Sequence, residues 1–196
     1  MRRSILVSVV SGILLLLLQG SAYAIAIEVA PQTQDVLLGS SANVDINISG
    51  LGDGVAPSVG DFDLNLVFDP GVLSFNNVTF GDQLDIFGMG SITGVDSSVL
   101  GVVRAFEVSL DSISDLNNLQ LPAFTLATFS FNTIAAGNSA LSLTLNALGD
   151  ANGDSLSATL QNGTINVTTV PEPATWLLFG VGLLAMFGMS RRSSQL

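Results

Sequence analysis

Apolar and polar side chains alternate along most of the chain between residues 25 and 169. Ile25, Ile27 and Val29 alternate with small or polar neighbours, and similar runs follow at residues 44–48, 62–68, 100–110, 124–133 and 141–145. A period of two with one apolar side is typical of a β-strand that buries one face. The pattern therefore predicts a series of half-buried strands.

Turn-forming residues separate the predicted strands. Asp69-Pro70-Gly71 predicts a turn followed by a strand over residues 72–80, and Ala136-Gly137-Asn138 predicts another turn. Asn162-Gly163 lies between short runs at 156–160 and 165–167 and predicts a β-hairpin. Residues 81–94 hold four glycines among irregular apolar positions, which predicts a long loop with at most one short strand. Residues 111–121 have room for one helical turn.

These segments make about nine strands at spacings of about 8 to 14 residues, a pattern typical of a β-sandwich or barrel. The chain has 196 residues, of which 48% are hydrophobic and 11% charged. That length allows one folded domain and short appendages. We therefore expect one all-β domain over residues 25–169.

The N-terminus has the parts of a secretory signal peptide. Arg2 and Arg3 precede an apolar run over residues 5–18, and Ala22 and Ala24 are the small residues that a signal peptidase requires. We expect cleavage after Ala24, so that residues 1–24 are a signal peptide and the mature chain is exported.

The C-terminus is predicted to be a transmembrane helix. Residues 174–190 contain no charged side chain, and Arg191 and Arg192 follow at once. A helix of these 17 residues spans about 25 Å, slightly less than a hydrocarbon core of about 30 Å. Trp176 suits the outer interface, and the arginines place the tail, residues 193–196, in the cytoplasm by the positive-inside rule. The β-domain then lies on the periplasmic side.

Val170-Pro171-Glu172-Pro173 stands directly before this predicted helix. The prolines end any preceding strand, as they also would in a plain linker. The motif, the short apolar helix and the arginine pair, over residues 170–192, closely resemble the PEP-CTERM sorting signal of Gram-negative bacteria that secrete exopolysaccharide. The resemblance implies that Val170, Pro171, Glu172 and Pro173 are read by an exosortase, a membrane-embedded processing enzyme. The inner membrane would then be a transient anchor.

Four further segments, between about residues 35 and 168, resemble cohesin-like domains in their order. They are SANVDINISGL, GDFDLNLVFDPGVLSFNNVTFGD, FTLATFSFNTIAAGNSALSLTL and LGDANGDSLSATLQNGTINV. Cohesin-like domains are jelly-roll β-sandwiches first known as receptors for dockerin modules. The resemblance implies that fold and a role as a receptor for another protein, without implying that a dockerin is present.

Charge and residue types exclude several classes of function. Residues 25–169 contain one cationic residue, Arg104, and 15 acidic residues, which gives this domain a net charge of −14. Such a domain repels nucleic acid, so we expect no nucleic-acid partner. The sequence has no histidine and no cysteine, which excludes their catalytic and zinc chemistry. We expect no cofactor, and we expect Arg104 to pack its stem on apolar neighbours and pair with an acidic side chain.

Two acidic patterns are candidates for chemistry. Asp150, Asn152 and Asp154 copy the first ligand positions of a calcium loop, but Ser155 and Gln161 replace the glycine and the bidentate carboxylate that such a loop requires. A polar turn is the preferred interpretation, with a weak calcium site of another geometry left open.

The second pattern is a possible carboxylate pair for glycoside hydrolysis, drawn from Asp61, Asp63, Asp82 and Asp85. No spacing marks such a pair, and exposed solubilising carboxylates are the preferred interpretation. We therefore expect no catalytic residue and no enzyme.

Two hypotheses of function follow. The first is an exported, exosortase-processed protein with a structural or adhesive role among exopolysaccharide, in a biofilm or extracellular matrix. The second is a cohesin-type binding module for another exported protein or a polysaccharide.

Overall fold

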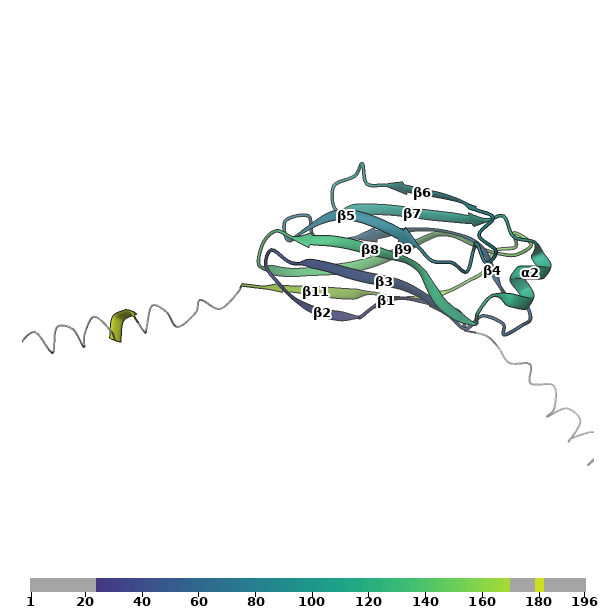
Figure 1. The fold of residues 1–196 in the computed structure, drawn as a ribbon, viewed down its shortest axis with the longest axis horizontal. Helices are drawn as coiled ribbons and strands as arrows, with labels where there is room; N and C mark the ends of the chain where they lie inside the picture. Colours follow the sequence, from purple (N-terminus) through teal and green to yellow (C-terminus); the bar gives the residue numbers. More distant parts are fainter. Residues whose placement is uncertain (1–23, 170–178, 182–196) are drawn as a thin grey trace, which may run out of the picture.

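The computed structural model describes residues 24–169 and 179–181, and residues 24–169 form two β-sheets packed face to face (Figure 1). The five-stranded sheet has the order β10-β1-β3-β8-β5, and the six-stranded sheet has the order β2-β11-β9-β4-β7-β6. The all-β sandwich predicted from the sequence is confirmed, with eleven strands in the described residues where about nine are predicted. Their bounds are β1 Ala26–Ala30, β2 Thr33–Leu37, β3 Ser41–Ser49, β4 Val59–Val67, β5 Leu73–Phe80, β6 Ser91–Asp96, β7 Val102–Ser109, β8 Ala123–Thr133, β9 Gly137–Asp150, β10 Thr159–Gln161 and β11 Gly163–Thr168, with one short helix, α2, at Ile113–Leu119.

The alternating residues of the sequence build the core between the two sheets. Phe62, Leu64 and Leu66 of β4 are at most 1% exposed, as are the two aromatic residues Phe129 and Phe131 of β8. The ring centroid of Phe131 lies 5.0 Å from that of Phe68 and 6.1 Å from that of Phe75 in tilted and edge-on arrangements, which aromatic pairs prefer. These contacts join β5 and β8 of the five-stranded sheet to Phe68, the residue that follows β4 of the six-stranded sheet.

Strand β7 confirms the predicted strand at residues 100–110. The side of β7 that faces the core is the one opposite to its larger apolar residues. Val103, Ala105 and Glu107 are at most 2% exposed, whereas Arg104 and Val108 point outward. The sequence alternates apolar residues on both sides here, so alternation alone does not decide which side faces the core.

Consecutive strands almost always belong to different sheets. Only β6 and β7, among the described strands, are consecutive partners in one sheet. The turn at Asp69-Pro70-Gly71 therefore passes from the six-stranded to the five-stranded sheet, and the Asp69 carboxylate accepts a hydrogen bond of 2.8 Å from the Gly71 amide within it. This crossing pattern is that of a jelly roll.

The predicted hairpin around Asn162-Gly163 is wrong. Strand β10 pairs with β1 and strand β11 pairs with β9 and β2, so the two strands lie in different sheets. The pairs β1–β10 and β2–β11 are parallel, and the chain continues from one sheet to the other at Asn162 without reversing. The Asn162 side chain accepts a hydrogen bond of 2.9 Å from the Leu143 amide of β9. The asparagine therefore links the chain to β9 and does not form a turn.

The loop and helix predictions are confirmed. Residues 81–90 form the loop, β6 begins at Ser91, and α2 lies within residues 111–121. Ser112 caps α2 by accepting a hydrogen bond from the Asp115 amide.

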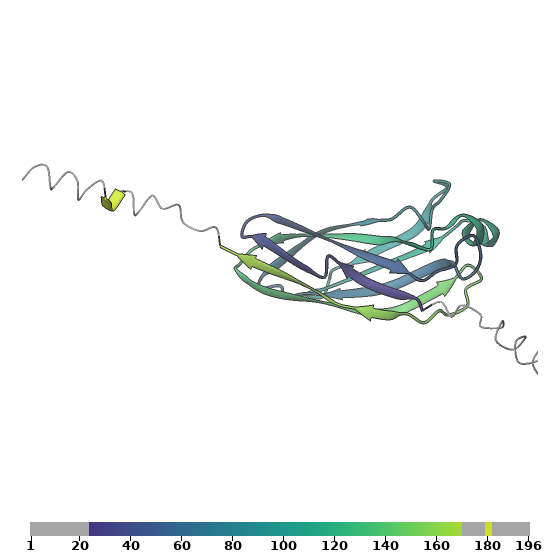
Figure 2. The same cartoon turned by 90° about the horizontal axis from the view of Figure 1, so that it is seen from below.

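The sandwich has two distinct ends (Figures 1 and 2). The tail end, from which β11 leads to residue 169, is made by the turns at residues 37–41, 67–73, 96–102 and 133–137. The helix end carries α2 and the loops at residues 49–59, 80–91, 109–123 and 150–159, and the described chain begins there at Ala24.

Candidate binding face on the six-stranded sheet

Most of the predicted processing and topology residues lie outside the described residues. These are Ala22, Val170, Pro171, Glu172, Pro173, Trp176, Arg191 and Arg192. Ala24 is described and exposed, and the adjacent Ile25 is only 6% exposed, with its carbonyl accepting a hydrogen bond from Thr159. The folded domain thus begins at the residue that follows the predicted cleavage site.

The predicted transmembrane helix at 174–190 also falls largely outside the described residues. Only residues 179–181 of this range are described, and they are helical. Within residues 24–169 and 179–181, no helix has both the length and the apolar character to span a bilayer.

The four aspartates considered for glycoside hydrolysis fall in two places, Asp61 and Asp63 on one side of β4 and Asp82 and Asp85 in the loop that follows β5. Asp63 is bound by Arg104, and the Asp61 carboxylate lies against Gly149 on β9. Burial raises the pKa of Asp61, and the nearby Asp150 carboxylate raises it further. Asp82 and Asp85 lie in the 81–90 loop, where Asp85 accepts a hydrogen bond of 2.9 Å from the Gly90 amide.

The calcium-like segment is a polar turn, as preferred from the sequence. One oxygen of the Asp150 carboxylate accepts hydrogen bonds from the amides of Asn152 and Asp154, at 2.7 and 2.9 Å. Gly153 completes the turn with a φ of +85°, a conformation that suits glycine. Among the residues that the structure describes, no three acidic side chains converge as metal ligands.

Arg104 is the centre of a polar cluster on the outer face of the six-stranded sheet. Its Nε donates hydrogen bonds of 2.9 and 3.1 Å to the two carboxylate oxygens of Asp63, and its Nη2 donates another. Asn146 donates a hydrogen bond of 3.0 Å to Asp63 and accepts one of 3.3 Å from Asn65. The predicted acidic partner of Arg104 is thus confirmed and identified as Asp63 of the neighbouring strand β4.

Phe106 forms the apolar floor beside this cluster. The guanidinium carbon of Arg104 lies 5.6 Å from the centroid of the Phe106 ring, within the range of a cation–π contact. The other edge of the ring covers Gly94 of β6, where an added Cβ would meet the ring at 2.2 Å. Gly94 therefore lets Phe106 lie flat across β6 and β7. We call Asp63, Asn65, Arg104, Phe106 and Asn146 the Arg104 face.

The electrostatics of the Arg104 face keep its ion pair charged. Hydrogen bonds from Arg104 hold the pKa of Asp63 below its ordinary value, against a smaller opposing effect of burial. The Arg104 side chain remains 50% exposed, while the Asp63 side chain is 17% exposed. The guanidinium is thus held in one orientation and remains accessible to a ligand.

Apolar side chains border the Arg104 face. Ile92 of β6 and Val108 of β7 are paired across the strands and are 54% and 39% exposed, and Val67 of β4 is 38% exposed. Arginine and aromatic residues surrounded by apolar and amide side chains are the combination enriched in protein interfaces. The Arg104 face is therefore suited to binding another molecule. The carboxylate of this face, that of Asp63, is already paired with Arg104.

The outer face of the five-stranded sheet differs in kind. Thr128 donates a hydrogen bond of 2.6 Å to Asp45, and Thr125 donates one of 2.8 Å to Asn47. Serine, threonine and asparagine make up most of the outward rows of β3 and β8. This face offers hydroxyl and amide groups on a hydrophilic surface.

Comparison with known proteins finds matches to two parts of the chain, the sorting signal and the fold of the sandwich. The model of the protein family described as "PEP-CTERM protein-sorting motif" matches residues 169–192. The chain carries a PEP-CTERM sorting signal. It is therefore an exported protein with a C-terminal membrane-anchor signal, and the sequence-based recognition of this signal is confirmed. No curated protein matches the chain.

The sandwich has the cohesin fold. CaCohA2 from Clostridium acetobutylicum is 22% identical with a TM-score of 0.56, over 73% of this chain and 91% of that one. The seventh ScaB type I cohesin from Pseudobacteroides cellulosolvens is 18% identical with a TM-score of 0.59, over 77% and 97%. A non-cellulosomal cohesin from the archaeon Archaeoglobus fulgidus is 18% identical with a TM-score of 0.56, over 74% and 91%. The resemblance to cohesin-like domains seen in the sequence is confirmed for the fold.

Sequence reasoning missed most of the Arg104 face. It singled out Arg104 and listed Asp63 only as one of several carboxylates. Phe106 follows Arg104 by two residues on β7, so the alternation of the sequence already places both on one side. Asn65 and Asn146 join them because β7 and β9 flank β4, which is a pairing of strands distant in sequence. The signal that could have indicated the face is the single cation in an anionic domain.

Proposed function

We propose that this protein is exported through its N-terminal signal, held in the inner membrane by residues 174–190 and processed by an exosortase at residues 170–173. The support is positional: the matched motif begins at residue 169, and β11 ends at Thr168. The folded domain therefore meets the sorting signal without an intervening linker domain. After processing, the sandwich acts at the cell surface or in the extracellular matrix.

At the surface, the sandwich serves as a binding module for another exported protein, through the Arg104 face. The observation that supports this best is the half-exposed guanidinium of Arg104, fixed by Asp63 and lying on Phe106. A fixed side chain loses little conformational freedom when it binds, so its hydrogen bonds are available at low entropic cost. The net charge of −14 favours a partner with a basic surface around the contact. The proposal assigns the protein no catalytic activity.

A structural role among exopolysaccharide is the second candidate, and the outer face of the five-stranded sheet favours it. Its hydroxyl and amide groups match the hydrogen-bonding groups of a neutral polysaccharide. The acidic domain would repel an anionic polysaccharide. In this case retention depends on many weak contacts and not on one side chain.

Recovery of the mature protein from the surface fraction of cells that express it tests the two candidates. We expect one stoichiometric protein partner, and we expect Arg104→Ala to weaken its binding about 30-fold, the effect of a hot-spot residue worth about 2 kcal/mol. Asn138→Ala is the matched control, since Asn138 is exposed on the same sheet and pairs with Asn166 away from the Arg104 face. Retention that is indifferent to Arg104→Ala and lost on digestion of the polysaccharide supports the second candidate and contradicts the first.

A further inference from the structure

An apolar band crosses the tail end of the sandwich. Its members come from three turns and are Leu37 (47% exposed), Leu38 (37%), Val99 (62%), Leu100 (84%) and Ile134 (53%). Among the described residues, Leu100 is the most exposed large apolar residue. Exposed apolar residues of this size in one region commonly mark an interaction surface.

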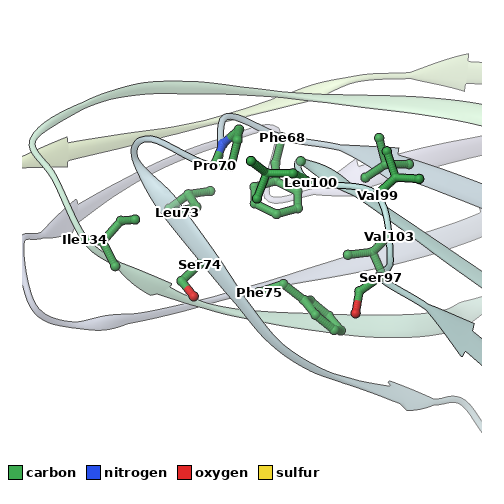
Figure 3. Close-up of a pocket in the computed structure, with 12 residues that line it drawn as sticks. Phe68, Pro70, Leu73, Ser74, Phe75, Ser97, Val99, Leu100, Val103 and Ile134 are labelled. Atoms are coloured by element: carbon green, nitrogen blue, oxygen red, sulfur yellow. The ribbon is translucent and has the colours of Figure 1, made fainter.

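The band is continuous with the point where the chain leaves the domain. The Leu38 amide donates a hydrogen bond of 2.8 Å to the carbonyl of Thr168, the last residue of β11, and the neighbouring Gly39 amide donates one to Thr133, next to Ile134. Ile134, Val99 and Leu100 line a shallow pocket of about 240 Å³ whose walls include Phe68 and Phe75 (Figure 3). The pocket extends the band from Leu100 and Ile134 to Ser74 and Phe75 of β5.

Acidic groups are concentrated at the opposite end. The loops of the helix end carry seven aspartates, whereas the turns of the tail end carry Asp69 and Asp96. Asp35 of β2 lies two residues before Leu37 of the band. Asp69 and Asp96 each accept a hydrogen bond from a backbone amide two residues later in the sequence. The seven aspartates of the helix end are Asp53, Asp82, Asp85, Asp111, Asp115, Asp150 and Asp154.

The length of chain beyond the domain decides what lies opposite the band. Five residues, 169–173, separate the end of β11 from the predicted membrane helix at 174. Even fully extended they span at most about 18 Å. The tail end therefore stays close to the bilayer for as long as the chain is anchored.

We propose that the apolar band contacts the lipid surface of the membrane that anchors the chain, at the level of the headgroups and upper acyl chains. The proposal rests on the proposed anchoring by residues 174–190. The tether makes the encounter intramolecular, so a small apolar contact suffices. The contact keeps the acidic helix end away from the bilayer and holds the sorting motif at the membrane surface, where a membrane-embedded processing enzyme can reach it.

The absence of cysteine from the sequence permits a site-specific test. Leu100→Cys and Ile134→Cys report on the band, and Met89→Cys is the matched control because Met89 is 80% exposed at the helix end. Each full-length variant carries an environment-sensitive fluorophore on its thiol and is reconstituted in phosphatidylcholine vesicles that contain nitroxide-labelled lipid. We expect a blue-shifted emission and at least threefold stronger quenching at positions 100 and 134 than at position 89.

Two further measurements separate the possible failures. Resistance to alkaline carbonate extraction shows whether the full chain is inserted. An inserted chain whose three positions are quenched equally overturns the lipid contact and leaves the anchor intact, whereas an extractable chain overturns both. A third result is a blue-shifted emission at position 100 that labelled lipid does not quench and whose shift disappears when the protein is diluted in the vesicles. This result assigns the band to a second copy of the chain and overturns the proposal.

Discussion

At the scale of single residues, Glu107 is a carboxyl group buried in the sandwich. It is 2% exposed on the inner side of β7, and its carboxylate accepts a hydrogen bond of 2.6 Å from Ser91. Burial raises the pKa of Glu107, repulsion from Asp85 raises it further, and the Ser91 hydrogen bond acts in the opposite direction. The folded state therefore favours the protonated carboxyl more than the unfolded chain does.

The effect of Glu107 on stability has a defined sign. An acid with a raised pKa in the folded state stabilises the fold most below its ordinary pKa of about 4.5, and this advantage is lost as the pH rises through the folded-state pKa. We expect Glu107→Gln to raise the free energy of unfolding at pH 7 and to change it little at pH 4, in denaturant titrations at both pH values. Asp53→Asn, at an exposed loop position, is the control; equal effects of Glu107→Gln at both pH values would contradict the assignment.

Single residues were predictable from the sequence to different degrees. The sequence predicts an acidic partner for Arg104, because Arg104 is the one cation among the 15 acids of residues 25–169. That the partner is Asp63 does not follow, because it depends on the β4–β7 register, and a bulge interrupts the β4–β9 pairing between Asp63 and Leu64. Charge and alternation can be seen in a few neighbouring residues of the sequence, whereas the register between strands is set by the packing of both sheets.

At the scale of elements, Gln120 joins α2 to the sheet. Its side chain is 4% exposed, donates a hydrogen bond of 2.9 Å to the Val59 carbonyl and accepts one of 2.6 Å from the Val59 amide. It also donates a hydrogen bond of 3.0 Å to the Gln83 carbonyl. One amide side chain thus holds the end of α2, the start of β4 and the 81–90 loop together.

Removal of this link should weaken the whole domain. We expect Gln120→Ala to lower the free energy of unfolding by about 2 to 3 kcal/mol, because it leaves buried backbone groups without partners. Gln161→Ala is the matched control, since the Gln161 side chain is exposed and bonded to Gln32. Chemical denaturation of both variants gives the comparison, and similar losses in the two variants would contradict the structural role of Gln120.

The elements also show where local patterns stop being informative. Strands and turns were predictable because alternation and turn residues act over a few neighbours. The partners of β10 and β11 were not, since a turn dipeptide indicates where a strand ends and not which sheet the next strand enters. The same limit hid β2, whose five residues alternate between exposed and half-buried positions with no strongly apolar side.

At the scale of the whole molecule, the two ends of the sandwich differ in composition. The tail end is apolar and adjoins the sorting signal, whereas the helix end gathers the acidic loops. The sequence indicates both signals at the termini, but the apolar band combines Leu38, Leu100 and Ile134 from three separate turns. Only the jelly-roll crossings bring these turns together.

The most direct test of the account is the intact mass of the protein recovered from the surface fraction. We expect the mass to lack residues 1–24 and the residues that follow the Pro171-Glu172-Pro173 motif, because we propose that signal peptidase and exosortase act at these places. Glu172→Ala should retain the C-terminal segment and keep the protein in the membrane fraction. A full-length mass at the surface, or normal processing of Glu172→Ala, would contradict the account.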